Sequence, residues 1–259
     1  MLPHPGNGRT AGQIWSVVDL FSGAGGASYG FHVNGAFRIA GAADAEIGKP
    51  STGHGAIDCN ATYLANIGVA PVAADLAIIE PAELGRTMAV APGIDVLIAC
   101  PPCTGFSRVV ANNHVRDDPR NSLVARVADY AEYFAPRVIF MENARELLRG
   151  RFSHHFERLR ESLESMGYRV RAEVHMLTRF GLPQQRERSL VLAVRDDIDQ
   201  TGIRSNTFAI ELPKGSGKMR EFPEVDRADW FSLEEARRKI LKGQVALLDQ
   251  FERKIPDGR

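Results

Sequence analysis

Short apolar runs alternate along the chain with segments whose apolar side chains recur every three or four positions. Each run is a few residues long and is bounded by glycine, proline or charged residues, which is typical of buried strands. The four clearest predicted strands are Trp15–Phe21, Ile94–Ala99, Val138–Met141 and Leu190–Val194. Strands that alternate with helices form a parallel sheet with helices packed on it, so the pattern predicts an α/β fold.

Two helices are predicted between these strands. One covers residues 156–166, where four apolar side chains share one face, and Gly167 ends it. Alternation over 170–174 then predicts another strand. The second helix covers residues 122–134 and ends before Pro136, because proline cannot continue a helix.

The chain is balanced in charge and moderately apolar. It has 32 basic and 32 acidic residues and 44% hydrophobic side chains, enough to bury one domain of ordinary size with an appendage. Because the charges cancel, no overall positive field indicates a nucleic-acid partner. Any DNA binding must therefore come from a local patch or from a second chain.

Cysteine and histidine usage gives no sign of a disulfide or metal site. Cys59, Cys100 and Cys103 show no paired spacing, and the seven histidines do not cluster with them as zinc ligands would, so we expect no metal. No apolar run reaches the ~18 residues of a membrane span, and the N-terminal pattern is not secretory. We expect a cytoplasmic setting and no membrane partner.

Lysine usage changes near residue 200. Lys49 is the only lysine before position 213, whereas five lysines follow it. We therefore expect an N-terminal extension over 1–13, a main domain over 14–200, and an appendage over 201–259 that could dock a partner. A helix predicted over 232–251 is interpreted as a solvated helix that closes the domain rather than as a nucleic-acid-binding helix.

A glycine-rich turn follows the first predicted strand. The sequence Asp19-Leu20-Phe21 leads into Ser22-Gly23-Ala24-Gly25-Gly26, where missing side chains let a ligand approach the backbone. Simple loop geometry explains such a turn equally well when it is considered alone. Asp44 and Glu46 end the next strand-like run, where a carboxylate could bind a ribose, and Asp75 is a third candidate acid. Each of these acids could equally be a solvated loop charge.

The most specific local signal is Cys100-Pro101-Pro102-Cys103. Two prolines fix the end of a strand and present Cys103 at the carboxyl edge of the sheet, where open α/β folds bind ligands. A lone cysteine is more often buried filler, and Cys100 is interpreted in that way. Cys103 lies beyond the prolines among small and polar residues, which favours a functional role.

Two further polar clusters lie next to predicted strands: one follows a strand, and the other precedes one. Glu142 and Asn143 end the strand that begins at Val138, so Glu142 should lie on the same edge as Cys103. Helix capping is the alternative for Asn143. Gln184-Gln185-Arg186-Glu187-Arg188 leads into the strand Leu190–Val194, and its two arginines share a face. Alone, they would be interpreted as surface ion pairs.

The order of these motifs, over residues 16–195, resembles the DNA cytosine-5 methyltransferase family. The glycine turn, Pro-Pro-Cys, Asp118-Pro119-Arg120-Asn121-Ser122-Leu123, Glu142-Asn143 and Gln-x-Arg-x-Arg all occur in the family's order. The resemblance implies a Rossmann-like fold, with a mostly parallel sheet flanked by helices, that binds S-adenosylmethionine and releases S-adenosylhomocysteine. Residues 14–200 would be the catalytic methyltransferase domain of a DNA methylation or restriction-modification enzyme.

The resemblance also implies roles for individual residues. The implied catalytic residues are Cys103, Glu142, Arg186 and Arg188, and the implied substrate-binding residues are Ser107, Asn143 and Gln184. The implied cofactor-binding residues are Asp19, Phe21, Ser22, Gly23, Ala24, Gly25, Gly26, Asp44, Ala45, Asp75, Leu76, Pro101, Pro102 and Leu123. Glu46 competes with Asp44 for the ribose.

The implied chemistry is covalent catalysis on a cytosine that is flipped out of the DNA duplex. The Cys103 thiolate would add to C6, and Glu142 would stabilise the charge at N3, so that C5 attacks the cofactor's methyl group. Arg188, with Arg186 behind it, would hold the cytosine carbonyl and a phosphate. Flipping the base would cost roughly a few kcal/mol.

The sequence departs from the family after the last motif. Residues 196–259 contain no target-recognition region, no Arg-Glu-x-x-Arg-Leu-Gln-like segment and no Gly-Asn helix. Either a second polypeptide supplies these parts, or the chain is a truncated or degenerate copy. We favour the first interpretation, because the catalytic Cys, Glu and Arg residues are retained.

Two other functions stay open. One is an RNA cytosine-5 methyltransferase, since a tRNA-modifying branch shares the same motifs. The other is a non-catalytic subunit that only binds S-adenosylmethionine. The enzyme interpretation requires that Cys103 and Glu142 face one pocket beside the glycine turn.

Overall fold

The computed structural model describes residues 14–47, 58–102, 117, 119–180, 186–198, 234 and 238, and within them it confirms the predicted α/β alternation. The strands are β1 Trp15–Leu20, β2 Phe37–Asp44, β3 Val72–Ala73, β4 Val96–Ala99, β5 Val138–Ala144, β6 Tyr168–Met176 and β7 Glu187–Arg195. The helices are α1 Gly26–His32, α2 Cys59–Ile67, α3 Pro81–Thr87, α4 Leu123–Phe134, α5 Glu146–Arg149 and α6 His154–Ser165, and two short 3-10 turns cover Pro119–Ser122 and Leu177–Arg179.

The individual predictions from the hydrophobic pattern are confirmed within a few residues. Both predicted helices form, as α4 and α6, and Gly167 ends α6 with a φ of 84°. The predicted tail helix, the N-terminal extension and the domain boundary near residue 200 fall largely outside the described residues. They stay predictions.

The strands form one seven-stranded sheet in the order β3-β2-β1-β4-β5-β7-β6. Parallel pairs join β3 to β2, β2 to β1, β1 to β4 and β4 to β5. Strand β7 is antiparallel to β6. Backbone hydrogen bonds join Asp196 to Gly167 at one end of this pair and Leu177 to Arg186 at the other. The sheet is therefore mostly parallel.

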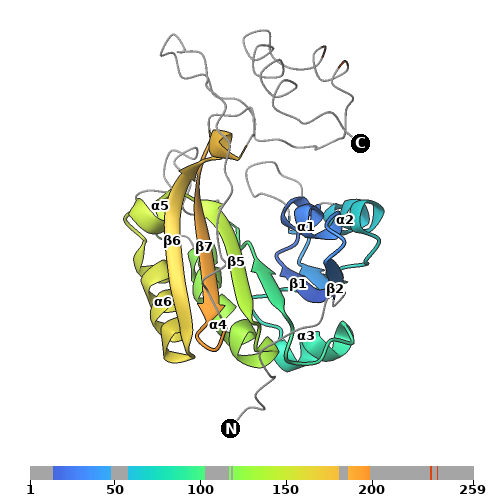
Figure 1. Cartoon of the computed structure of the whole chain (residues 1–259), viewed down its shortest axis with the longest axis horizontal. Helices are drawn as coiled ribbons and strands as arrows, with labels where there is room; N and C mark the ends of the chain where they lie inside the picture. Colours follow the sequence, from blue (N-terminus) through green and yellow to red (C-terminus); the bar gives the residue numbers. More distant parts are fainter. Residues whose placement is uncertain are drawn as a thin grey trace. The chain divides into compact units, whose positions relative to one another are not determined.

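Alternate residues of each strand pack into different cores on the two faces of the sheet. Val96 and Ile98 of β4 pack with Tyr63 and Ile67 of α2, on the face that also carries α1. Their neighbours along β4 face a larger core that includes α4 and α6. Figure 1 shows α4 and α6 side by side behind the sheet, with α1 and α2 near β1 and β2. This doubly wound arrangement positions the site described below.

The chain divides into two compact units. Residues 14–173 and 189–198 belong to the first unit, and residues 174–180 and 186–188 to the second. The candidate cofactor site lies within the first unit. In the described part of the chain, no helix has the length and apolarity that crossing a bilayer requires.

Candidate active site

The chain changes direction in the sheet between β1 and β4. From β1 it moves outward through β2 and β3, and it then returns to place β4 on the other side of β1. Leu20 of β1 lies opposite Ala43 of β2 and Ala99 of β4, so the carboxyl ends of the three strands meet at one edge. Ligands bind in the crevice outside such a switch point.

The glycine-rich turn of residues 21–26, called the cofactor turn after its predicted role, leaves β1 at this edge with a strained backbone. Phe21, Gly23 and Gly25 have φ values of 58°, 50° and 92°, in the left-handed region that side chains disfavour. A Cβ atom on Gly25 would lie 3.1 Å from Ile67 Cγ1 and 3.2 Å from Tyr63 Cδ2 of α2. The turn therefore needs glycine at position 25, for its conformation and for close packing against α2.

Asp44 holds the cofactor turn from the end of β2. Its Oδ2 accepts a hydrogen bond from the backbone N–H of Gly23 at 2.9 Å, and its Oδ1 accepts one from Glu46 N–H at 2.7 Å. The Cys59 thiol lies 3.5 Å from Oδ1, and burial, with the neighbouring Asp44 carboxylate, raises the pKa of this thiol to about 12. Cys59 is therefore a protonated donor. Because a carboxylate oxygen can accept two bonds, Asp44 keeps capacity for a ligand.

Glu46 differs from Asp44 in its partners. Its Oε1 accepts a hydrogen bond at 2.9 Å from the backbone N–H of Asn60, in the first turn of α2. Glu46 thus stabilises the start of α2, while Asp44 faces the cofactor turn. This geometry supports Asp44 over Glu46 as the ribose-binding acid, a role that stays a prediction.

Asp19 precedes the turn in β1, and the residue is 1% exposed. Ser28 of α1 donates a hydrogen bond to Asp19 Oδ2, and the Tyr63 hydroxyl donates one to Ser28 at 2.8 Å. Burial raises the pKa of Asp19 to about 7, although the hydrogen bonds from Ser28 and Tyr63 oppose the shift. Asp19 therefore links β1 to α1 and α2. Ser28 and Tyr63 gave no signal in the sequence.

The remaining predicted cofactor residues of the first unit come from several elements. Asp75 follows β3, is exposed, and accepts a hydrogen bond from Ala77 N–H at 2.9 Å, while Leu76 is buried. Ala45 follows Asp44 at the end of β2, and Ala24 accepts a bond from Asn66 of α2 at 3.4 Å. Leu123 lines a hollow of about 580 Å³ together with Ala77, which follows Asp75 by two positions, and with residues of α4 and α6. The cofactor role of Leu123 stays a prediction.

The ends of β4 and β5 are tied together by Asn143. Its Nδ2 donates a hydrogen bond at 3.0 Å to the carbonyl of Pro101, and its side chain is 1% exposed. Ile98 lies opposite Phe140, so the same register carries Glu142 to the level of Cys100. Glu142 is half-buried there, beside the prolines that precede Cys103.

The catalytic set is only partly described. Cys103, Ser107 and Gln184 lie outside the described residues, so whether Cys103 and Glu142 face one pocket stays a prediction. Arg186 precedes β7, and Arg188, in β7, donates a hydrogen bond to the Glu187 carbonyl at 2.9 Å. Both arginines belong to the second unit.

The residues at the edge fit S-adenosylmethionine. Ser22 is 7% exposed, yet its buried Oγ has no hydrogen-bond partner within the described ranges. An orphaned hydroxyl beside a turn with two left-handed glycines leaves polar capacity and backbone room for a ligand. Asp44 adds an acceptor at the position where such folds bind a ribose.

The sheet order, the glycine turn after β1 and the acid that ends β2 define a class: a Rossmann-like α/β protein with a nucleotide-type cofactor site. The family model for C-5 cytosine-specific DNA methylases matches residues 15–249. The chain belongs to this family, as its motifs predicted. The family uses S-adenosylmethionine and methylates cytosine in DNA.

Individual relatives agree with this assignment. The type II methyltransferase M.DdeI of Desulfomicrobium norvegicum is 27% identical over 70% of this chain and 41% of its own length. The type II methyltransferase M1.HphI of Haemophilus parahaemolyticus is 33% identical over 70% of this chain and 46% of its own length.

A similar solved structure is that of an E. coli prophage protein described as a DNA modification methyltransferase. It has a TM-score of 0.57 and 23% identity over 71% of this chain and 49% of that one. This likeness confirms the predicted fold. The chain thus spans about half, or less, of the length of the relatives it matches.

Proposed function

We propose that this chain transfers a methyl group from S-adenosylmethionine to C5 of a cytosine flipped out of duplex DNA, and that a second polypeptide supplies target recognition. The observation that carries the proposal is that the predicted cofactor residues and the predicted catalytic Glu142 lie on the same edge of the sheet. The cofactor turn with Asp44 ends β1 and β2, and Glu142 with the Asn143–Pro101 hydrogen bond ends β5 and β4.

On the cofactor side, the turn would receive the methionine part along its backbone from Gly23 to Gly26. Phe21 would pack on the adenine, and Asp44 would accept hydrogen bonds from the ribose hydroxyls. Asp75 would accept one from the adenine amino group. The bound cofactor supplies the methyl group.

On the substrate side, the Cys103 thiolate would add to C6 of cytosine, and Glu142 would hold N3 and stabilise the charge that develops there. Electron density would then reach C5, which takes the methyl group. A base would remove the C5 proton, and the bond from C6 to sulfur would break to release the thiolate. Asn143 would keep Glu142 aligned with the proline turn before Cys103.

Arg186 and Arg188 would complete the substrate side. The two arginines stand at alternate positions where the chain enters β7, and a guanidinium offers paired donors to a carbonyl or a phosphate. These residues would therefore hold the O2 of the cytosine and the adjacent phosphate.

One feature of the sheet favours a second polypeptide. On the sheet face that carries α1, Phe140, Leu190 and Leu192 are only half-buried. Packing of another helix there would remove more of this apolar surface from water. With no net charge, the chain would also rely on its partner for much of the attraction to DNA.

The test is transfer of labelled methyl to duplex DNA and to tRNA, by this chain alone and together with the product of the neighbouring gene. Cys103→Ser is the catalytic variant, and Cys100→Ser is the matched control. We expect DNA labelling only when both polypeptides are present, abolished in Cys103→Ser and retained in Cys100→Ser.

Other outcomes select other functions. Preferential labelling of tRNA would establish an RNA methyltransferase. Cofactor binding without transfer to either substrate would identify a non-catalytic subunit. Full transfer by the chain alone would rule out the need for a partner.

A further inference from the structure

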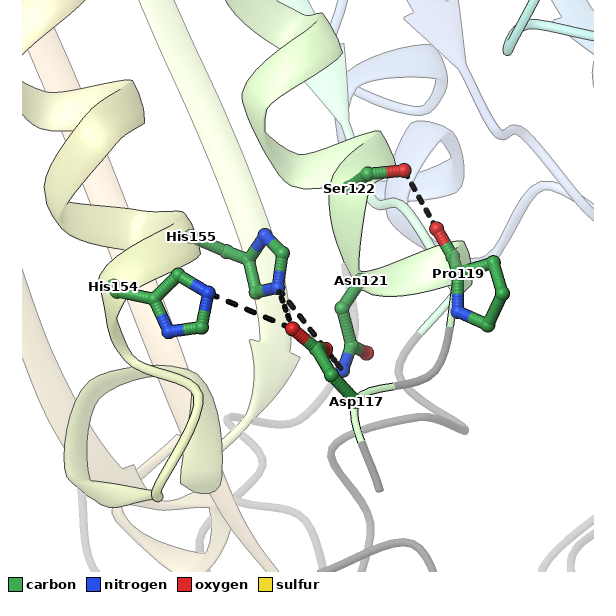
Figure 2. Close-up of polar contacts among 6 residues, drawn as sticks. All are labelled: Asp117, Pro119, Asn121, Ser122, His154 and His155. Carbon is green, nitrogen blue, oxygen red and sulfur yellow. Dashed lines mark hydrogen bonds and ion pairs between the residues drawn. The ribbon is translucent and has the colours of Figure 1, made fainter.

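Figure 2 shows a cluster of one carboxylate and two imidazoles, formed by Asp117, His154 and His155. Asp117 precedes the 3-10 turn that leads into α4, and His154 and His155 begin α6. His155 Nε2 lies 2.9 Å from Asp117 Oδ2 and 3.1 Å from its Oδ1. His154 Nε2 lies 3.5 Å from Oδ2. One ligand atom from each residue falls within 4.8 Å of the others.

We propose that Asp117, His154 and His155 bind a divalent transition-metal ion of the Zn²⁺ type. Imidazole nitrogen and carboxylate oxygen are ligands that Zn²⁺ accepts at about 2.0–2.2 Å, which puts two ligand atoms of a tetrahedral site roughly 3.3–3.5 Å apart. The separations of 2.9 Å and 3.5 Å between the histidine nitrogens and Asp117 lie close to this spacing. Small side-chain shifts would bring the three atoms around one ion.

The surroundings orient the ligands as metal sites require. Asn121, which is fully buried, donates a hydrogen bond from Nδ2 to Asp117 Oδ1 at 2.7 Å. It is held in place by the short turn in which the Ser122 hydroxyl donates to the Pro119 carbonyl at 2.6 Å. Hydrogen bonds of this kind fix the direction of a ligating carboxylate and raise metal affinity.

Burial and exposure also suit an open three-ligand site. The His155 side chain is 9% exposed and fixes one wall, whereas His154 and Asp117 are 49% and 39% exposed. The open side leaves a fourth position for water, as in zinc sites with three protein ligands. Mg²⁺ is a poor match, because it prefers an octahedral shell of oxygens.

Such an ion would connect two elements that are distant in the sequence. Asp117 belongs to the connection between β4 and α4 that also contains Cys103, while the histidines start α6. The ion would tie this connection to α6, which packs against α4. This site is independent of methyl transfer, and its test does not use that activity.

The test is calorimetric titration of Zn²⁺ into the untagged, chelator-treated full chain at neutral pH, with absorption of bound Co²⁺ as a spectroscopic probe. We expect one Zn²⁺ bound per chain through this site, and no comparable binding of Mg²⁺. His154→Gln and Asp117→Asn should each weaken Zn²⁺ binding by at least about tenfold. His32→Gln removes an exposed histidine of α1 and should bind Zn²⁺ as the parent chain does.

The variants separate a metal site from a simple ion pair. His154→Gln and Asp117→Asn change half-exposed side chains, so they decide the matter even where His155→Gln fails to fold, and thermal unfolding without metal checks their folding. If the parent chain takes up no Zn²⁺, or if both variants bind Zn²⁺ as tightly as the parent chain, the two histidines only form ion pairs with Asp117 and the proposal is overturned.

Discussion

Gly25 adopts a φ of 92° in the cofactor turn and has α2 directly against its Cα. Gly25→Ala should destabilise the fold by about 1–3 kcal/mol, because the residue is left-handed and the added Cβ would lie 3.1 Å from Ile67 Cγ1. It should also weaken S-adenosylhomocysteine binding. Denaturant unfolding and calorimetric titration measure the two effects.

The matched control is Gly30→Ala within α1, where a Cβ meets nothing within 4 Å. Alanine favours helix over glycine by up to about 1 kcal/mol, so this variant should be as stable as the parent chain or more so. Equal behaviour of the two variants would contradict the strained turn.

Asp19 makes stability depend on pH. Burial raises its pKa from 3.8 to about 7, so the folded chain holds a proton that the unfolded chain releases between about pH 4 and 7. The stability from this proton is full below about pH 4 and is lost as the pH rises through 7. Asp19→Asn is neutral throughout. Its stability relative to the parent should therefore improve by a few kcal/mol from pH 4 to 8, since a tenfold change in proton affinity is worth about 1.4 kcal/mol.

Urea unfolding at a series of pH values measures this difference. Asp58→Asn, at an exposed position just before α2, is the control variant. Parallel curves for Asp19→Asn and the parent chain would show that Asp19 is ionised in the folded state.

At the scale of elements, the Asn143 side chain adds a hydrogen bond between β5 and Pro101, beyond the backbone pairing of β4 with β5. Asn143→Ala leaves the buried carbonyl of Pro101 without its donor, which costs about 1–3 kcal/mol. We expect methyl transfer by the proposed enzyme to fall about tenfold or more, with unchanged affinity for S-adenosylhomocysteine, because the proposal assigns Asn143 to the substrate side. Single-turnover rates and calorimetric Kd values separate the two effects.

Asn34→Ala is the control for this experiment. Asn34 accepts a local bond from Ala36 N–H at an exposed turn after α1, so its loss should leave the rate intact. A fall in cofactor affinity equal to the fall in rate would assign Asn143 to the cofactor site instead.

At the scale of the whole molecule, cofactor binding should not need a partner. The cofactor turn, Asp44 and Asp75 all belong to the first compact unit. S-adenosylhomocysteine should therefore raise the Tm of this chain alone, with about 2.7 kcal/mol of added stability at a hundredfold excess over Kd. Thermal unfolding with adenosine as the comparison ligand measures this. An unchanged Tm at saturating concentration would mean that the partner completes the cofactor site.

The sequence by itself determined the local structure and the family. Burial of alternate or every third to fourth side chain leaves a periodic pattern, so β1, β4, β5, α4 and α6 could all be predicted. The order of the glycine turn, Pro101-Pro102-Cys103, Glu142-Asn143 and the two arginines identified the family before any geometry was known.

Only the tertiary structure decided which residues meet across the sheet. Local pattern carries no information on strand order, so the position of β4 beside β1 and the bond from Asn143 to Pro101 could not be predicted. The hydrogen bond from Ser28 of α1 to the buried Asp19 also became visible only in the tertiary structure. The two histidines of α6 gave no signal, because their partner Asp117 is distant in sequence and only the packing of α4 on α6 brings them together.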